Sequence, residues 1–222
     1  MAGKADRMEV APVINCPDFA CAAKRFSAAA EWGAPWIHID VADGLFAPVT
    51  TWGNPAELKK LIAAHPEADV EVHLMVKNPA AVAEAWFEAG ARRLIVHVET
   101  LDGAEGKQIN VLIEQGTEHG AEVVVALAPR TPVAEIVPYL NVVYAVQCLA
   151  VPVGPSGQTF DERIIEKVSY LRLRNPDLFI EVDGGVTPAV ARRVSEAGAD
   201  MVAVGSYIFN ARNPHAAYRE LL

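Results

Sequence analysis

Histidine and aspartate residues stand in or just after three of the apolar runs in this chain, at spacings that suit catalysis or metal binding. In the run at 36–41, alternation along a strand directs His38 and Asp40 to one face and the aliphatic side chains to the other. His73 stands in a second run, and Asp183 directly follows a third. Because buried polar side chains need partners, we expect these four residues to converge.

Two imidazoles and two carboxylates form a mixed nitrogen and oxygen ligand set, which suits Zn²⁺, Fe²⁺, Mn²⁺ or Co²⁺ better than Ca²⁺ or Mg²⁺. A metal bound to a ketone oxygen and the neighbouring hydroxyl acidifies the C–H bond between them and stabilises the enediolate. Asp40 and Asp183 could flank that carbon, one removing a proton and the other returning one to the opposite face, which is epimerisation. The simpler alternative is that His38 and His73 are hydrogen-bonded core residues, but four such groups at matching strand ends favour a site.

Three loops in the C-terminal half of the chain, at 153–158, 183–187 and 205–209, are rich in small residues. Glycines let backbone N–H groups approach an anion closely, and the start of a short helix favours negative charge. Since these loops carry no Lys or Arg before Arg212, we expect backbone amides to hold a phosphate group. The candidate phosphate-binding residues are Gly154, Ser156, Gly157, Gly184, Gly185, Gly205 and Ser206.

Eight short apolar runs alternate with amphipathic segments. The runs lie at 10–14, 36–41, 70–75, 94–98, 123–127, 142–148, 179–182 and 201–204, and the helical segments at 18–31, 55–64, 79–88, 107–118, 132–139, 162–173, 188–196 and 214–222. This order indicates the α/β class, a (β/α)₈ TIM barrel in a single domain over 1–222, with a short polar extension at 1–8. The C-terminal strand ends of such a barrel form its active site. The alternative, an open doubly wound sheet, would need a Gly-rich loop after the first strand, and residues 15–18 do not form one.

The composition narrows the function further. The chain has 222 residues and a formal net charge of −9, which disfavours nucleic acid and anionic membranes as partners. No apolar run approaches the roughly 20 residues of a membrane span, and the start lacks a secretory apolar region. Cys16, Cys21 and Cys148 form no metal-type or redox pair, and their odd number argues against a disulfide framework. We therefore expect a reduced, cytoplasmic protein.

His97 and Glu99 share a face at the end of the fourth run. One interpretation is that they orient a metal ligand from behind. The other is an ordinary structural hydrogen bond, and the sequence leaves both open.

The chain resembles the ribulose-phosphate 3-epimerases over nearly its full length. The shared motifs are Ala11-Pro12 with Asp18-Phe19, His38-Ile39-Asp40-Val41-Ala42-Asp43-Gly44 with Phe46, His73-Leu74-Met75-Val76 with Asn78-Pro79, Gly157-Gln158 with Phe160, Glu181-Val182-Asp183-Gly184-Gly185-Val186, and Ala197-Gly198-Ala199 with Gly205-Ser206 and Phe209.

The resemblance implies a (β/α)₈ barrel and one divalent metal ion, Zn²⁺ ahead of Fe²⁺, Mn²⁺ or Co²⁺. The implied ligands are His38, Asp40, His73 and Asp183, with Asp40 and Asp183 also the acid/base pair and Met75 beside the substrate. The implied reaction is epimerisation at C3 of a ketose phosphate, D-ribulose 5-phosphate to D-xylulose 5-phosphate, in the pentose phosphate pathway.

Several positions depart from the family pattern. Val13 stands where the family usually has Ser near the substrate, and Ala42 and Leu149 stand where it has Met. The loop commonly written Pro-Gly-Phe-Gly-Gly-Gln reads Val153-Gly154-Pro155-Ser156-Gly157-Gln158. Ala42 is expected to leave a more open floor under the reacting carbon. These changes keep open a related substrate such as a hexulose phosphate.

Two further functions remain as alternatives. A metal-free phosphosugar lyase or decarboxylase would need a Lys at a strand end, and Lys77 lies just past the third run. A non-catalytic phosphosugar-binding relative is favoured by Val13 and Ala42 but opposed by the intact ligand set. The resemblance also implies a homo-oligomer, a dimer or larger. Its interface could use Trp36, Trp52 and Trp86, unless these side chains pack against the barrel.

Overall fold

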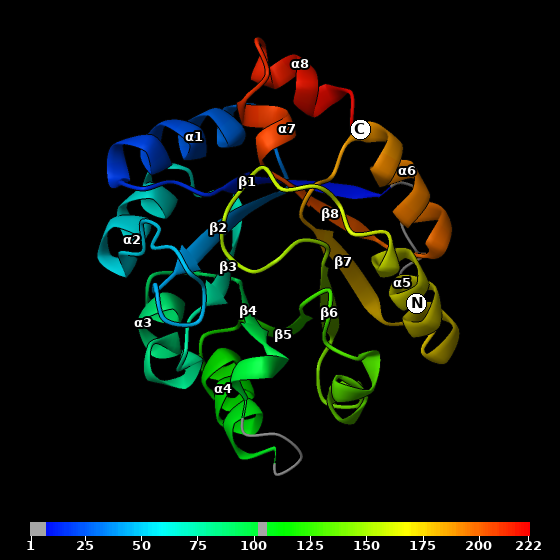
Figure 1. The fold of residues 1–222 in the computed structure, drawn as a ribbon. Coiled ribbons are helices and arrows are strands. Elements are labelled where there is room, and N and C mark those ends of the chain that lie inside the picture. The colour runs from blue at the N-terminus through cyan, green and yellow to red at the C-terminus, as the bar shows by residue number, and fades with distance from the viewer. Residues whose placement is uncertain (1–7, 102–105) are drawn as a thin grey trace.

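The computed structural model describes residues 8–101 and 106–222, and within them eight parallel strands close into a barrel in chain order (Figure 1). The strand β1 pairs with both β2 and β8, which closes the ring and excludes the open sheet. The strands are β1 (Glu9–Ile14), β2 (Trp36–Ala42), β3 (Asp69–Met75), β4 (Arg93–His97), β5 (Glu122–Leu127), β6 (Ala145–Leu149), β7 (Phe179–Asp183) and β8 (Met201–Val204). The predicted TIM barrel is confirmed.

Helices form the outer ring of the barrel (Figure 1). Several begin where the sequence offers a side-chain cap, as Asp18, Asn54, Thr187 and Asn213 each accept a hydrogen bond from a backbone N–H of the first turn. The helices are α1 (Phe19–Glu31), α2 (Pro55–Ala64), α3 (Ala83–Glu88), α4 (Lys107–Glu118), α5 (Arg163–Arg174), α6 (Pro188–Ala197), α7 (Ser206–Phe209) and α8 (Pro214–Arg219).

The segment after β5 differs from the prediction. Instead of one helix over 132–139 it forms two short 3₁₀ turns, Val133–Glu135 and Val137–Tyr139. Pro138 lacks the N–H that an α-helix would use and crowds the carbonyl four residues earlier. Ile136 and Tyr139 are buried, a spacing of three that matches the 3₁₀ turn. Smaller differences occur at β6, which begins three residues later than expected, and at 79–88, where a 3₁₀ turn (Pro79–Ala81) precedes α3.

The expected absence of a disulfide is wrong. Cys16 and Cys21 are joined, with their Cα atoms 5.8 Å apart, while Cys148 is free and buried. The short turn after β1 returns the chain onto α1, and Asp18 caps that helix by accepting a hydrogen bond from the Cys21 N–H. The cap brings the two sulfur atoms together, which a count of cysteines cannot anticipate.

The barrel separates the apolar layer under the helices from an interior that holds buried polar side chains together with a small apolar cluster, Ile95, Val124, Ala126 and Ala145. Outward side chains of β2 and β3, such as Ile39 and Val72, join the large core between strands and helices. Among the described residues no helix has both the length and the apolar character to cross a lipid bilayer. The predicted extension at 1–8 lies outside the described residues except for Met8.

Candidate active site

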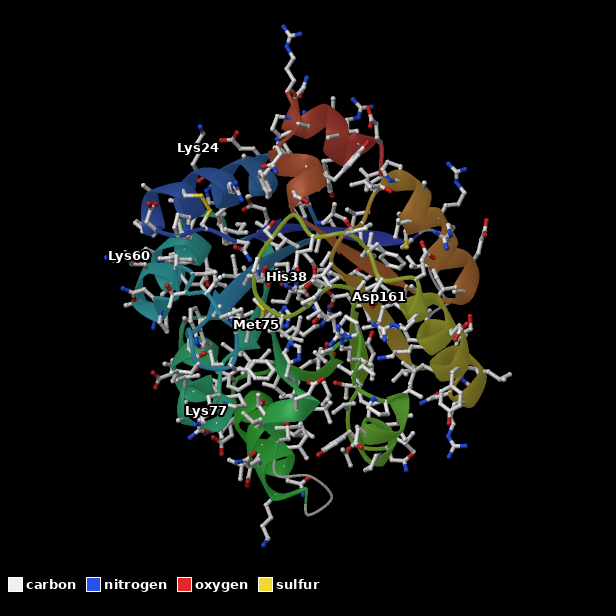
Figure 2. All side chains as sticks on the ribbon, in the orientation of Figure 1. Lys24, His38, Lys60, Met75, Lys77 and Asp161 are labelled. Carbon is white, nitrogen blue, oxygen red and sulfur yellow. A yellow bond between two sulfur atoms is a disulfide. The ribbon has the colours of Figure 1, made fainter. Side chains whose placement is uncertain are left out.

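The four predicted ligands meet at the C-terminal mouth of the barrel. Asp40 and His73 are lateral neighbours in the β2–β3 ladder, and Asp183 ends β7. All four side chains are buried, and their ligand atoms lie within 4.8 Å of one another. Figure 2 shows His38 and Met75 near the barrel axis, while Lys24 and Lys60 lie on the outer ring. Strands far apart in sequence therefore build one cluster.

The donor atoms point at a common centre. Nδ1 of His73 lies 3.1 Å from Oδ1 of Asp40 and 3.5 Å from Oδ2 of Asp183. Nε2 of His38 lies 3.3 Å from the same Asp40 oxygen but makes no hydrogen bond, although it is buried. An orphaned imidazole nitrogen beside two carboxylates is the arrangement that a divalent cation satisfies. The residues present thus fit a metal ion of the type expected.

Hydrogen bonds behind the cluster select the imidazole tautomers. Nδ1 of His38 lies 2.8 Å from Oε1 of Glu71, so an Nδ1–H donor leaves the Nε2 lone pair facing the centre. Nε2 of His73 lies 2.9 Å from Nε2 of His97, whose Nδ1 lies 3.0 Å from Oε2 of Glu99. With protons on Nδ1 of His38 and Nε2 of His73, each ring donates away from the four-residue cluster. Nε2 of His38 and Nδ1 of His73 then keep the lone pairs that a metal ion would use. Of the two interpretations of His97 and Glu99, this geometry favours the orienting one.

The two carboxyl groups of the pair have opposite electrostatic surroundings. Burial raises the pKa of Asp40, but hydrogen bonds and charge from His38 and His73 outweigh it, and the pKa falls well below its usual range. Burial also raises the pKa of Asp183, where the His73 hydrogen bond is too weak to offset burial and the nearby Asp40 charge. The surroundings thus lower the pKa of one carboxyl group and raise that of the other.

A second polar layer lies below the cluster. Nη1 of Arg93 lies 3.0 Å from Oε2 of Glu71, and Nε2 of Gln147 donates to Glu181 at 3.2 Å. The Arg93 guanidinium also stacks 3.8 Å above the Trp36 ring. Sequence reasoning missed this layer, because its only signal was a charged or amide residue within an apolar run. The layer supports His38 from below through Glu71.

A narrow hollow with a cavity volume of about 40 Å³ lies above the cluster. Asp40 and Asp183 line it, and in Figure 1 the β6–α5 loop lies across the barrel mouth. The hollow also contains every predicted substrate and phosphate residue, namely Met75, Gly154, Ser156, Gly157, Gly184, Gly185, Gly205 and Ser206. The predicted acid/base pair and the predicted substrate and phosphate residues therefore line one hollow.

The divergent positions divide into two groups. Val13 and Leu149 line the hollow, so they alter its wall as expected. Ala42 does not line it but packs with Ala47 and Met75 in a separate apolar cluster. The expected open floor at Ala42 is therefore wrong, because side chains of the segment after β2 cover this position.

Sequence reasoning missed two further residues, one in the hollow and one at the end of β5. Asn15 lines the hollow directly after β1 and hydrogen-bonds Asp40. Lys167 reaches the end of β5 from α5, and its ammonium group donates to the carbonyls of Ala128, Pro129 and Thr131. With three acceptors in place, this Lys is a structural tie and not a free amine.

The barrel, its buried His/Asp cluster and the glycine-rich hollow define a TIM-barrel enzyme of acid–base chemistry on a small molecule. The comparisons with known proteins agree. Residues 9–209 match the family described as "Ribulose-phosphate 3 epimerase family". The chain belongs to the ribulose-phosphate 3-epimerase family, whose members are isomerases acting on carbohydrates.

Named relatives cover almost the whole chain. It is 35% identical to the cytoplasmic isoform of ribulose-phosphate 3-epimerase from Oryza sativa subsp. japonica, over 93% of this chain and 89% of the rice protein. It is also 35% identical to ribulose-phosphate 3-epimerase from Aquifex aeolicus, over 96% of this chain and 94% of that protein. A solved ligand complex of KGPDC from Streptococcus mutans superposes with a TM-score of 0.76 at 14% identity, covering 96% of this chain and 95% of that one. At that identity the last match shows the fold alone.

Proposed function

We propose that this enzyme interconverts D-ribulose 5-phosphate and D-xylulose 5-phosphate by moving a proton at C3. The observation that carries the proposal is the pair of carboxyl groups, Asp40 from β2 and Asp183 from β7, in one buried cluster around His73. Each is 7% exposed and lines the same hollow, so a substrate bound there can meet one carboxyl group on each face. Two such groups are what a two-base epimerisation requires.

The proposed reaction has two proton transfers. One carboxylate, Asp40 in one direction, accepts the proton from C3, and the electron pair of the C–H bond moves toward the C2 carbonyl, which gives an enediolate. Asp183 then delivers a proton to C3 from the opposite face, and the two roles exchange in the reverse reaction. A divalent cation on His38, Asp40, His73 and Asp183 would supply positive charge beside the ketone, which acidifies the C3–H bond. Zn²⁺ is the first candidate, followed by Fe²⁺, Mn²⁺ and Co²⁺.

The phosphate group is assigned to the glycine-rich loops after β6, β7 and β8. The support is that Gly154, Gly184 and Gly205 line the same hollow as the carboxyl pair. Gly184 and Gly185 have positive φ angles, which orient successive N–H groups as an L side chain would not allow. With its phosphate group at these loops, the sugar would extend from the loops to Asp40 and Asp183.

The deciding experiment follows the C3 hydrogen of D-ribulose 5-phosphate in deuterated water by NMR. Metal-loaded protein is expected to exchange this hydrogen and form D-xylulose 5-phosphate, and Asp183→Asn is expected to lose both. A loss of about a hundredfold to ten-thousandfold is expected for removal of an acid/base group. A full metal site without exchange or conversion would refute the proposed substrate.

A related ketose phosphate such as a hexulose phosphate is the second candidate. Its support is that Val13 gives the hollow an aliphatic wall where the family usually has Ser, which changes the contacts open to a bound sugar. Six-carbon ketose phosphates assayed in the same way would distinguish the two. A non-catalytic phosphosugar-binding role is less well supported, because His38 retains an orphaned nitrogen facing both carboxylates.

We further propose a cytoplasmic homo-oligomer, a dimer or larger. The cytoplasmic location is supported by the rice relative, which is named as a cytoplasmic isoform. Trp52 and Trp86 are buried in the chain's own core and offer no interface. The exposed apolar side chains Leu45 and Leu173 offer better contact points. Light scattering of the purified protein tests the assembly, and a monomer at all concentrations would contradict it.

A further inference from the structure

The carboxamide of Asn15 connects the acid/base pair to the loop above the hollow. Asn15 directly follows β1 and lines the hollow on the side of Val13. Its Nδ2 donates to Oδ2 of Asp40 at 2.9 Å and to the carbonyl oxygen of Gly154 at 3.3 Å. One amide group therefore contacts a reacting carboxylate and the β6–α5 loop at the same time.

The two oxygens of Asp40 have different partners. Oδ1 faces the imidazoles of His38 and His73 at 3.3 and 3.1 Å, so it belongs to the buried cluster. Oδ2 turns toward Asn15 and the hollow. The two oxygens turn together about the terminal torsion of the side chain, which is broad in aspartate. The imidazole contacts at Oδ1 and the Asn15 N–H group at Oδ2 therefore hold this torsion from opposite ends of the carboxylate.

The loop end of the bridge is also well defined. Gly154 is buried with a φ of 116°, and a Cβ there would lie 3.1 to 3.3 Å from side chains of the segment after β2. The Gln158 side chain donates to the carbonyls of Pro152 and Pro155, which closes the loop on itself. The Asn15 bond to Gly154 then joins this closed loop to Asp40. The loop and the carboxylate are thus held by the same amide.

We propose that Asn15 is a positioning residue that holds Oδ2 of Asp40 toward C3 of the substrate when the β6–α5 loop is seated. This inference rests on the proposed epimerase function. The proton leaves C3 for Oδ2 of Asp40 while the C–H electron pair moves toward the carbonyl, and Asp183 supplies the returning proton. Asn15 takes no proton and acts only through the orientation of Asp40.

The test uses Asn15→Leu, which keeps the branched shape of the side chain and removes both hydrogen bonds. Only the proton transfer at Asp40 should slow, whereas transfer at Asp183 should remain fast. From the epimer that Asp183 deprotonates, solvent deuterium should therefore enter unreacted substrate faster than product forms. From the other epimer, solvent deuterium should enter unreacted substrate only slowly. The isotope effect of deuterium at C3 on the conversion rate should be larger than in the wild type. Conversion is expected to fall about tenfold to a hundredfold.

A merely structural role would give a different pattern. Damage to the whole pocket would reduce wash-in and conversion in equal proportion from both epimers, with unchanged isotope effects, and that result would overturn the proposal. The matched control is Gln158→Ala, which loosens the loop without touching Asp40. It is expected to raise KM more than it lowers kcat and to show no asymmetry between epimers.

Hydrogen exchange of backbone amides separates failure of this inference from failure of the proposed function. If the wild type acts on neither pentulose phosphate, the proposed function fails, but the Asn15 bridge still has a readout. Amides at 153–158 should exchange faster in Asn15→Leu than in the wild type, because Gly154 loses its anchor. Equal exchange rates would show that the bridge does not hold the loop and would overturn the inference.

Discussion

At the scale of single residues, the hydrogen bonds behind His73 depend on Glu99, which His97 connects to it. One oxygen of Glu99 accepts from the Ala128 N–H at 2.8 Å and from the Thr131 hydroxyl, and the other faces His97 at 3.0 Å. Burial alone would raise the pKa of Glu99, but the bond to His97 and these other donors lower it from 4.5 to about 2. The ionised form is therefore the one that the fold stabilises.

The first prediction concerns the pH dependence of this contribution. Because the folded pKa of Glu99 lies below the unfolded one, its stabilisation is complete above about pH 4.5 and is lost as the pH falls toward 2. Glu99→Gln should lower the free energy of unfolding by about 2 kcal/mol at neutral pH, and the difference should shrink at acidic pH. Urea unfolding of both proteins across this range measures it. A difference that does not change with pH would contradict the assignment.

At the scale of elements, the turn between β1 and α1 holds the Cys16–Cys21 disulfide. We predict that the unreduced protein resists alkylation at all three cysteines, and that reduction exposes Cys16 and Cys21 only. Burial raises the pKa of the Cys148 thiol to about 12, so this group stays protonated and unreactive in the folded chain. Mass spectrometry after iodoacetamide treatment, with and without reductant, identifies which cysteines are alkylated. Modification of Cys16 without reductant would mean that the pair is not joined in solution.

Another element-scale prediction concerns the contact between the loops after β6 and β7. Gly185 has a φ of 68°, and a Cβ there would lie 2.4 Å from the backbone nitrogen of Phe160. Gly185→Ala should therefore push the two loops apart, raise KM for the phosphorylated substrate about tenfold or more, and destabilise the fold by more than the roughly 1 kcal/mol of an unfavourable φ. The control is Gly33→Ala, which has a similar φ of 71° and nothing within 4 Å of the added carbon. Equal loss of stability in the two variants would show that loop contact is not the cause.

Sequence periodicity predicted the elements whose signals are local. The strands could be assigned because each is an apolar run, and the ligands because they stand at the ends of such runs. The 3₁₀ turns at 133–139 were missed because the sequence pattern there fits a helix. Pro138 disfavours that helix but does not indicate which structure forms in its place. The Cys16–Cys21 pair and the role of Asn15 depend on how the turn after β1 folds back, which no periodicity records. Arg93 was missed because its acidic partners come from other strands.

At the scale of the whole molecule, the barrel differs from a simple apolar core because Arg93, Glu71 and Glu181 are buried in its interior. Arg93 reaches Glu71 at 3.0 Å within the barrel and Glu122 at 3.3 Å near its edge. Burial and the charge of Glu71 raise the pKa of Glu181, so the fold already resists a second negative charge in this space. The guanidinium of Arg93 thus compensates the charge of Glu71, the carboxylate that accepts the hydrogen bond from His38.

The last prediction tests this compensation. Arg93→Met keeps an apolar contact with the Trp36 ring but leaves Glu71 buried without its cation, and should cost about 3–5 kcal/mol in unfolding free energy. The neighbouring Arg92→Met is the matched control, because Arg92 is 62% exposed and lies 3.7 Å from Asp69 at the surface. It should change stability by no more than about 0.5 kcal/mol. Urea unfolding at neutral pH measures both. Similar small effects in the two variants would mean that Glu71 gives up its charge instead, and His38 would then lose the carboxylate that directs its tautomer.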